Sequence, residues 1–154
     1  MTERTTEHAT FTVERTLEAP PSRVFAAWSD RTAKARWFTG TDEPGEEYQL
    51  DFKVGGHEVS RAEAPDGFHY TYDARYAEIV PDRRIAYSYT MDRGETRISV
   101  SVTTVEFIAS GSGTALVLTE QGAFFDGGDR LEYREEGTRS LIDALAEVLD
   151  RMDS

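Results

Sequence analysis

Residues 11–30 read FTVERTLEAPPSRVFAAWSD, in which two prolines separate an alternating segment from a helix-like one. Phe11, Val13 and Leu17 lie on one face at the period of a half-buried β-strand, and Arg15 is the one residue that breaks this apolar face. Pro20-Pro21 ends that strand, and proline suits the first turn of a helix because it loses no hydrogen bond there. The stretch therefore predicts a strand over residues 11–18 and a short helix over residues 22–28.

The rest of the chain continues as strands and turns until one long helix closes it. Asp30 is a predicted N-cap of a second short helix that ends at Trp37-Phe38. Alternating segments separated by Gly, Pro and Asp turns then predict six strands, at residues 48–52, 57–63, 68–80, 84–91, 97–108 and 114–121.

Two irregularities stand out in this second part of the chain. The apolar phase slips between Val102 and Val105, which predicts a β-bulge. Residues 129–152 carry a helical apolar stripe that Gly137 interrupts, and either close packing or a kink would explain that glycine.

This order predicts an α+β fold. Hairpin-length connections make the sheet antiparallel, and the final helix is the only large amphipathic element that can cover it. A curved sheet around one helix leaves a space between them, which is a ligand pocket where side chains do not fill it. We predict a flexible tail over residues 1–10 and a single domain over residues 11–152.

Several segments together resemble the START/SRPBCC superfamily, and more closely its branch named after the activator of heat-shock-protein-90 ATPase. They are residues 11–30, Trp37-Phe38, DFKVGG at 51–56, YAEIVPDRRI at 76–85 and GTALVLTEQG at 113–122. The resemblance covers about residues 10–152 and implies the helix-grip fold, with a cavity between the sheet and the C-terminal helix. Relatives often have tryptophan after the glycine of the last helix. Thr138 holds that place in this chain, which would reshape the cavity.

Composition excludes several chemistries. Acidic residues outnumber basic ones 29 to 17, giving a net charge of −12, which argues against a general nucleic-acid binder. The absence of cysteine excludes disulfides, thiolate nucleophiles and cysteine-ligated metals. Only Lys34 and Lys53 are lysines, which disfavours Schiff-base chemistry. His57 and His69 lack metal-ligand spacing, so we expect no metal and no cofactor.

Aromatic residues are the candidates for a ligand-binding surface. The three tyrosines Tyr70, Tyr72 and Tyr76 of the predicted strand at 68–80 share one face, and Tyr87 and Tyr89 share a face of the next strand. Tyr133 shares a helix face with Gly137 and Leu141. Each could line a pocket or pack in the core, and the same alternatives hold for the aromatic residues of the short helices. The candidate ligand-binding residues are Trp37, Tyr70, Tyr72, Tyr76, Tyr87, Tyr89, Glu120 and Tyr133.

Glu120 is the candidate for acid–base chemistry. It follows Leu116 and Leu118 at period two, so its carboxylate faces either the interior or solvent at a strand end. In the interior its pKa would be raised, and with a pocket tyrosine it could act as acid or base.

Three functions remain open from the sequence. The first is binding of a small apolar molecule, the second a cyclase- or hydrolase-like enzyme using the same cavity, and the third a chaperone-interacting module as the family name suggests. We expect no nucleic-acid partner. We also expect no membrane partner and a cytoplasmic location in a bacterium, since no apolar segment has the length of a membrane span. A homodimer stays open.

Overall fold

The computed structural model describes residues 4–152. Its elements are β1 (Thr6–Leu17), α1 (Pro21–Ser29), α2 (Arg31–Phe38), β2 (Tyr48–Leu50), β3 (His57–Glu63), β4 (His69–Val80), β5 (Arg84–Arg93), β6 (Thr96–Ser110), β7 (Gly113–Phe125) and α3 (Leu131–Met152). No described helix is both long enough and apolar enough to cross a membrane.

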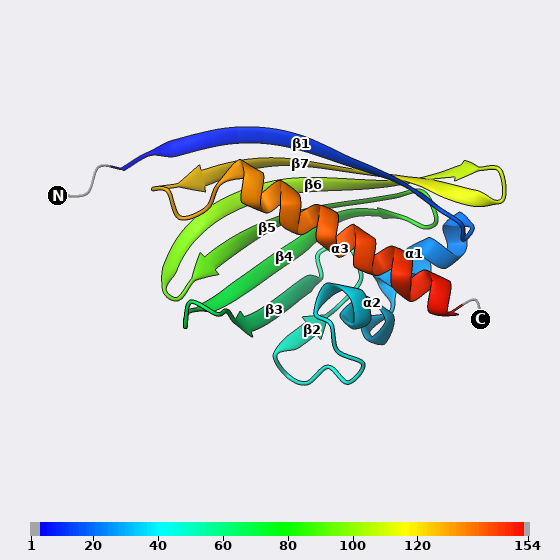
Figure 1. Cartoon of the computed structure of the whole chain (residues 1–154), viewed down its shortest axis with the longest axis horizontal. Coiled ribbons are helices and arrows are strands. Elements are labelled where there is room, and N and C mark those ends of the chain that lie inside the picture. The colour runs from blue at the N-terminus through cyan, green and yellow to red at the C-terminus, as the bar shows by residue number, and fades with distance from the viewer. Residues whose placement is uncertain (1–3, 153–154) are drawn as a thin grey trace.

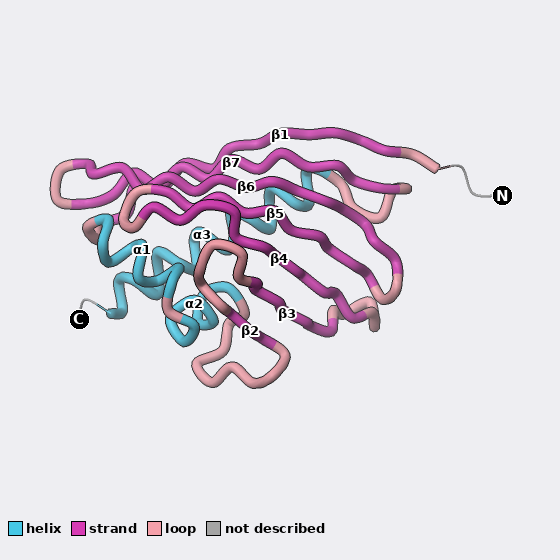
Figure 2. Tube along the Cα trace, turned by 180° about the vertical axis from the view of Figure 1, so that it is seen from behind, coloured by secondary structure: helices cyan, strands magenta, loops and turns pink. Residues whose placement is uncertain are grey.

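All seven strands form one antiparallel sheet in the order β1-β7-β6-β5-β4-β3-β2. The helix α3 runs diagonally across one face, and α1 and α2 lie together at one end of the sheet (Figure 1). The view from behind shows the strands in front of α3, so α3 covers a single face (Figure 2). The predicted α+β helix-grip arrangement is confirmed, with two short helices after the first strand.

The helix α1 begins one residue before the predicted start at residue 22, and α2 begins directly after its predicted N-cap, Asp30. Pro21 occupies the first helical position of α1. The Asp30 side chain caps α2, because its Oδ2 accepts a hydrogen bond of 2.9 Å from the backbone N–H of Ala33.

The N-terminal strand is longer than predicted. β1 begins at Thr6, so the tail expected over residues 1–10 is wrong for residues 6–10, and residues 1–3 lie outside the described part of the chain. The reason is β7, which was expected to end at Gln121 but continues to Phe125. Its added residues pair with β1, Phe125 opposite Thr6.

The bulge predicted between Val102 and Val105 is absent from the pairing of β6, which is continuous there with both neighbours. The phase slip has another cause: Ser101 and Thr103 face the interior, while Val102 is 49% exposed on the outer face. A polar interior patch therefore interrupts the apolar pattern. The register with β5 shifts instead near Ile98.

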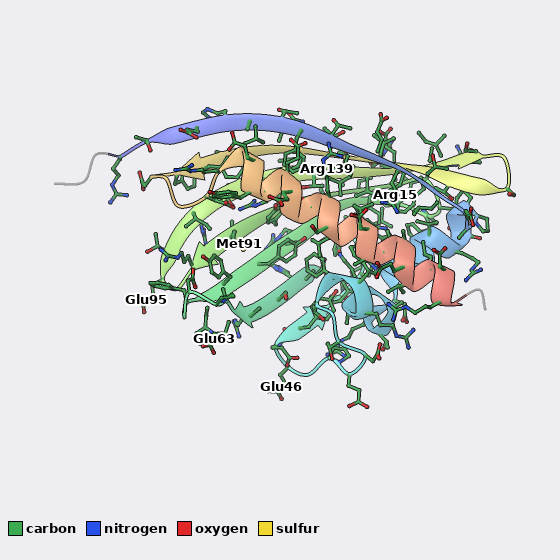
Figure 3. The ribbon with its side chains drawn as sticks, in the orientation of Figure 1. Arg15, Glu46, Glu63, Met91, Glu95 and Arg139 are labelled. Carbon is green, nitrogen blue, oxygen red and sulfur yellow. The ribbon has the colours of Figure 1, made fainter. Side chains whose placement is uncertain are left out.

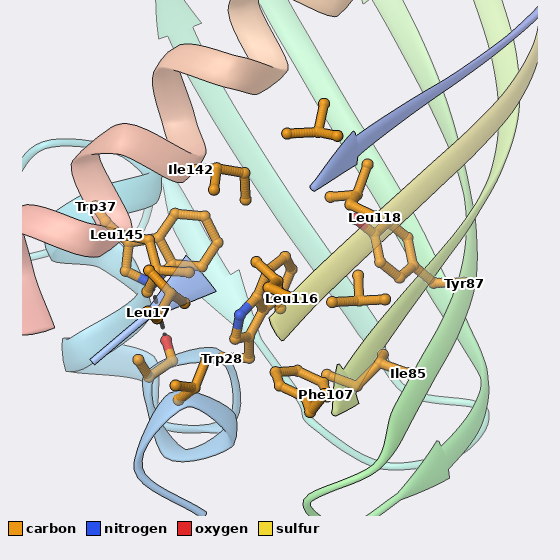
Figure 4. Packing of buried hydrophobic residues seen from close by; sticks show 14 of the residues in the cluster. Leu17, Trp28, Trp37, Ile85, Tyr87, Phe107, Leu116, Leu118, Ile142 and Leu145 are labelled. Atoms are coloured by element: carbon orange, nitrogen blue, oxygen red, sulfur yellow. Dashed lines mark hydrogen bonds between the residues drawn. The ribbon is translucent and has the colours of Figure 1, made fainter. Parts of the chain in front are cut away.

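The core lies between α3, the short helices and the sheet. The C-terminal half of α3 presents Ile142, Leu145, Val148 and Leu149, all of them buried. Figure 4 shows Ile142 and Leu145 beside Trp37 and Leu116, between the helices and the strands. The N-terminal half of α3 is less deeply packed, and the space it leaves is the site described next.

Candidate functional site

A cavity of about 330 Å³ lies beneath the N-terminal half of α3. Its walls come from α1, α2 and α3 and from the inner faces of β3, β4, β5 and β7. Met91 of β5, which lies toward the end of the sheet far from α1, is part of the lining (Figure 3). This volume is at the lower end of the range for ligand pockets, so it suits one compact molecule.

Small residues make this space. Ser60 and Ala62 line the cavity from β3, and Gly137 and Thr138 line it from α3. A Cβ added at Gly137 would have no atom within 4 Å, so neither close packing nor a contact explains this glycine. Gly137 faces open space beside the cavity.

Aromatic rings form most of the wall. Trp28 and Trp37 meet edge to face with centroids 4.7 Å apart, and Tyr72 lies 5.0 Å from Phe38 and 4.7 Å from Tyr89. The two tryptophans are also buried core residues, so packing and lining are the same role for them. Figure 4 shows both rings between α3 and the sheet.

Most of the candidate residues come together at this cavity. Those that line it are Trp37, Tyr70, Tyr72, Tyr87, Tyr89, Glu120 and Tyr133. The predicted shared face of Tyr133, Gly137 and Leu141 is confirmed, because all three lie on the cavity side of α3. Tyr76 is the exception, since it points to a separate polar cluster.

Tyr76 belongs to a cluster around Glu58, which the sequence analysis did not identify. The Glu58 carboxylate is fully buried and accepts hydrogen bonds from Tyr76 at 2.7 Å, from Tyr48 at 2.6 Å and from the Lys34 ammonium at 2.7 Å. Burial raises the pKa of both tyrosines, and the carboxylate raises it further, so they remain donors.

Lys34 is buried against three rings of the cavity wall. Its Nζ lies 5.0 Å from the ring centroid of Trp28, 5.7 Å from that of Trp37 and 4.8 Å from that of Phe38. Burial lowers the pKa of Lys34, and Glu58 opposes that shift. The pair holds α2 to β3 behind the aromatic wall.

Glu120 is buried, 3% exposed, at the other polar part of the cavity. The interior alternative for this residue is therefore correct. The Tyr89 hydroxyl lies 2.8 and 2.9 Å from its two carboxylate oxygens, and Ser101 donates at 3.2 Å. Burial raises the pKa of Glu120, and hydrogen bonds and the nearby charge of Arg134 offset only part of that rise.

Arg134 of α3 ties this carboxylate to its surroundings. Its Nη1 donates to the Tyr89 hydroxyl at 2.8 Å and lies 3.4 Å from Glu120. Its Nη2 donates to Ser99 at 2.8 Å and to Asp129 at 2.7 Å. Its Nε also donates to Asp129 at 3.1 Å, so every N–H group of the guanidinium has an oxygen acceptor.

The sequence analysis missed Arg134, although it lies beside Tyr133 and three residues before Gly137 on the helix stripe. The inward-facing polar residues of β6 that surround Arg134 left only one sign in the sequence, which is the slip of the apolar pattern in that strand. Glu58 and Lys34 left no comparable signal, because a charged residue at an inward position is ordinarily read as surface.

The mouth of the cavity is more polar than its interior. Tyr133 is 62% exposed there, and the Tyr70 hydroxyl donates to Asp66 at 2.8 Å. An outer recess shares these two tyrosines and adds Arg93 and Arg130. Within residues 4–152, no three His, Asp or Glu side chains are grouped to hold a metal ion.

Comparison with known proteins supports the fold resemblance. The family model described as "Activator of Hsp90 ATPase homolog 1-like protein" matches residues 18–150. No match is found among curated proteins.

Solved structures of bacterial proteins are similar over nearly the whole chain. A putative uncharacterized protein from Rhizobium leguminosarum is 47% identical with a TM-score of 0.91, covering 97% of this chain and 99% of that one. The Mll3558 protein from Rhizobium loti is 49% identical with a TM-score of 0.87, covering 94% and 99%. Protein CV1439 from Chromobacterium violaceum is 27% identical with a TM-score of 0.72, covering 90% and 95%.

Proposed function

The chain belongs to the family of Activator of Hsp90 ATPase homolog 1-like proteins, and from this premise we propose that it binds a small, largely apolar molecule in the cavity under α3. One observation carries the proposal: a cavity of about 330 Å³ opens between α3 and the sheet, and aromatic rings form most of its wall. A concave site lined mainly by apolar and aromatic side chains is typical of small-molecule binding. A bound ligand would cover ring surface that otherwise faces water.

The chain provides its own reporter for this binding. Its only two tryptophans, Trp28 and Trp37, both line the cavity. Titration with indane, a compact two-ring hydrocarbon, should change the tryptophan emission in a saturable way. Absence of a saturable change with indane and with a panel of similarly sized apolar compounds would reject the proposal.

A matched pair of variants separates cavity binding from surface adsorption. Gly137→Leu places a side chain into the open space at the cavity and gains helix propensity. Ser140→Leu adds the same side chain at an exposed position of α3 that does not line the cavity. The first should weaken indane binding at least tenfold, while the second should leave it unchanged.

A second candidate function is proton transfer on a bound substrate, as in a cyclase-like enzyme. The buried Glu120 carboxyl beside the Tyr89 hydroxyl favours it, because burial raises the pKa of this carboxyl and so makes it a stronger base than an exposed glutamate.

The test of this candidate is deuterium exchange next to the carbonyl of 1-indanone in D₂O, followed by NMR. Catalysed exchange should fall about a hundredfold or more in Glu120→Gln, the range of general acid–base contributions. Exchange no faster with the wild-type protein than in buffer would reject the enzyme candidate and leave the binding proposal intact.

A further inference from the structure

The outer recess at the cavity mouth is lined by two arginines. It shares Tyr70, Met91 and Tyr133 with the cavity, so the two spaces adjoin at these residues. Arg93 of β5 and Arg130, which directly precedes α3, line the recess. A molecule that fills the cavity and extends past its mouth therefore meets positively charged side chains.

The charge of Arg130 has no acidic partner in contact with it within residues 4–152. The residue is exposed, and its guanidinium lies against the ring of Tyr133, 5.8 Å from the ring centroid. The neighbouring Asp129 is engaged by other donors: Arg134 donates to its Oδ2 at 2.7 and 3.1 Å, and the backbone N–H of Arg130 donates to its Oδ1 at 2.8 Å. The guanidinium of Arg130 therefore keeps its donors for water or for a ligand.

Arg93 is positioned by groups of the same end of the sheet. Its Nε lies 3.5 Å from Asp66, and its guanidinium stacks on the ring of Phe68 at 3.9 Å from the centroid. Asp66 also accepts a hydrogen bond from the Tyr70 hydroxyl at 2.8 Å. Because Asp66 offsets the charge of Arg93, an anion at the recess depends first on Arg130, and Arg93 adds a second, weaker attraction.

The interior of the cavity has no comparable cation to offer. Lys34 and Arg134 are the buried cations among the described residues. Lys34 donates to Glu58, and Arg134 donates to Asp129 and Tyr89. Burying a charged group without a partner is strongly unfavourable. An anionic group of a ligand is therefore stable at the recess, where water also reaches it, and not against the aromatic wall.

Resting on the proposed binding function, we propose that the ligand is an amphipathic acid, whose apolar body lies in the cavity and whose anionic head group binds Arg130 at the outer recess. A guanidinium suits this role because its planar array of N–H donors matches the oxygens of an acid group. The net charge of −12 opposes an anion at long range, so this recognition depends on contact with the arginine.

Octanoate and octanamide test this inference. They share an eight-carbon chain and a planar head group of similar shape, but only octanoate is charged at neutral pH. The flexible chain lets the tail enter the cavity while the head group reaches the recess. Dissociation constants follow from the emission of Trp28 and Trp37, which line the cavity. Octanoate should bind the wild type about two- to fivefold more tightly than octanamide, the range of an exposed ion pair.

Three variants assign that preference to a residue. Arg130→Gln should remove it, and Arg130→Lys, which keeps the charge, should retain most of it. Arg139→Gln is the matched control, because it removes the same charge from an exposed arginine of α3 that lines neither space. Figure 3 shows Arg139 on the β1 side of α3 and Met91, a recess residue, on the opposite side. The control should leave the preference unchanged.

Salt provides an independent readout. Raising the ionic strength from about 0.05 M to about 0.5 M should weaken octanoate binding to the wild type, because the ion pair is exposed and therefore screened. Octanamide binding should not weaken. Octanoate binding that is equally insensitive to salt would mean that its head group contacts no charge, which overturns the inference.

The outcomes separate this inference from the proposed function. If octanoate and octanamide bind equally well, or if Arg130→Gln leaves the preference unchanged, the acid inference is wrong and the binding function stands. If the cation octylammonium binds more tightly than octanoate, the inference is also wrong, since the mouth then selects the opposite charge. If neither indane nor any of these probes binds the wild type, the proposed function fails and takes this inference with it.

Discussion

The ion pair between Lys34 and Glu58 gives the sharpest stability prediction. Both side chains are essentially unexposed, at 1% and 0%, and their contact is 2.7 Å. In Lys34→Met the apolar stem is kept and the ammonium is lost. Glu58 then retains its hydrogen bonds from Tyr48 and Tyr76 but has no positive charge beside it.

The magnitude follows from burial. Removing one partner of a buried ion pair costs about 3–5 kcal/mol, because the other charge stays desolvated. The two remaining tyrosine donors favour the lower end, so we expect a loss of about 3 kcal/mol in the free energy of unfolding. Against a typical total of roughly 5–15 kcal/mol, this is a large fraction of the stability.

Urea denaturation followed by far-UV circular dichroism measures this loss. The double variant Lys34→Met/Glu58→Gln removes both charges and should recover at least half of the single-variant loss, since a neutral buried pair avoids the unpaired charge. A loss below about 1 kcal/mol in Lys34→Met, or no recovery in the double variant, would refute the claim that an unpaired buried carboxylate causes the effect.

Further predictions concern the same pair, the cap, the helix and the cavity carboxyl. Because the pKa of Lys34 is lowered in the folded state, the unfolded chain binds more protons than the folded chain at every pH between the folded-state and unfolded-state pKa of this lysine. The stability of Glu58→Gln should therefore rise with pH until the unfolded-state lysine value of 10.5 is reached, as urea midpoints would show. Asp30→Ala should lower the free energy of unfolding by about 1 kcal/mol, because the Ala33 N–H loses its acceptor; an unchanged urea midpoint would contradict this role. Gly137→Ala should raise it by about 0.5–1 kcal/mol, because the added methyl group meets open space; calorimetry showing a lower Tm would be inconsistent with it. The raised pKa of Glu120 favours the folded state at low pH, and that contribution is lost as pH rises through the folded pKa. Glu120→Gln should therefore gain stability relative to the wild type from about pH 4.5 upward, and parallel pH profiles would argue against it.

Much of the architecture was predictable because it depends on local patterns. Period-two alternation, Gly and Pro turns and one helical stripe gave the element order, and Asp30 identified the start of α2. The errors lie where pairing partners decide the outcome. β1 extends to Thr6 because β7 continues beside it, and no pattern within residues 6–10 signals that partner.

The cavity was predictable in outline for the same reason. The tyrosines of β4 and β5 share the inner face, as alternation requires, and Glu120 follows Leu118 onto it. The chain has no cysteine, and its histidines lack metal-ligand spacing. The polar groups expected at the site were therefore carboxylates, tyrosines and arginines. Glu120, Asp129 and Arg134 are the charged residues that line it.

The sequence by itself determined which residues of one helix or strand share a face, because the direction of a side chain follows from the period of its element. Only the tertiary structure decided what each of them meets. Tyr72 and Tyr76 lie four residues apart on one face of β4, yet the ring of the first packs beside Tyr89 in the cavity wall and the second donates to Glu58. Arg134 likewise meets Glu120 only because α3 crosses the sheet at that point. Hydrogen bonds act over about 3 Å, so their partners are set by how helices and strands pack and not by the pattern within any one of them.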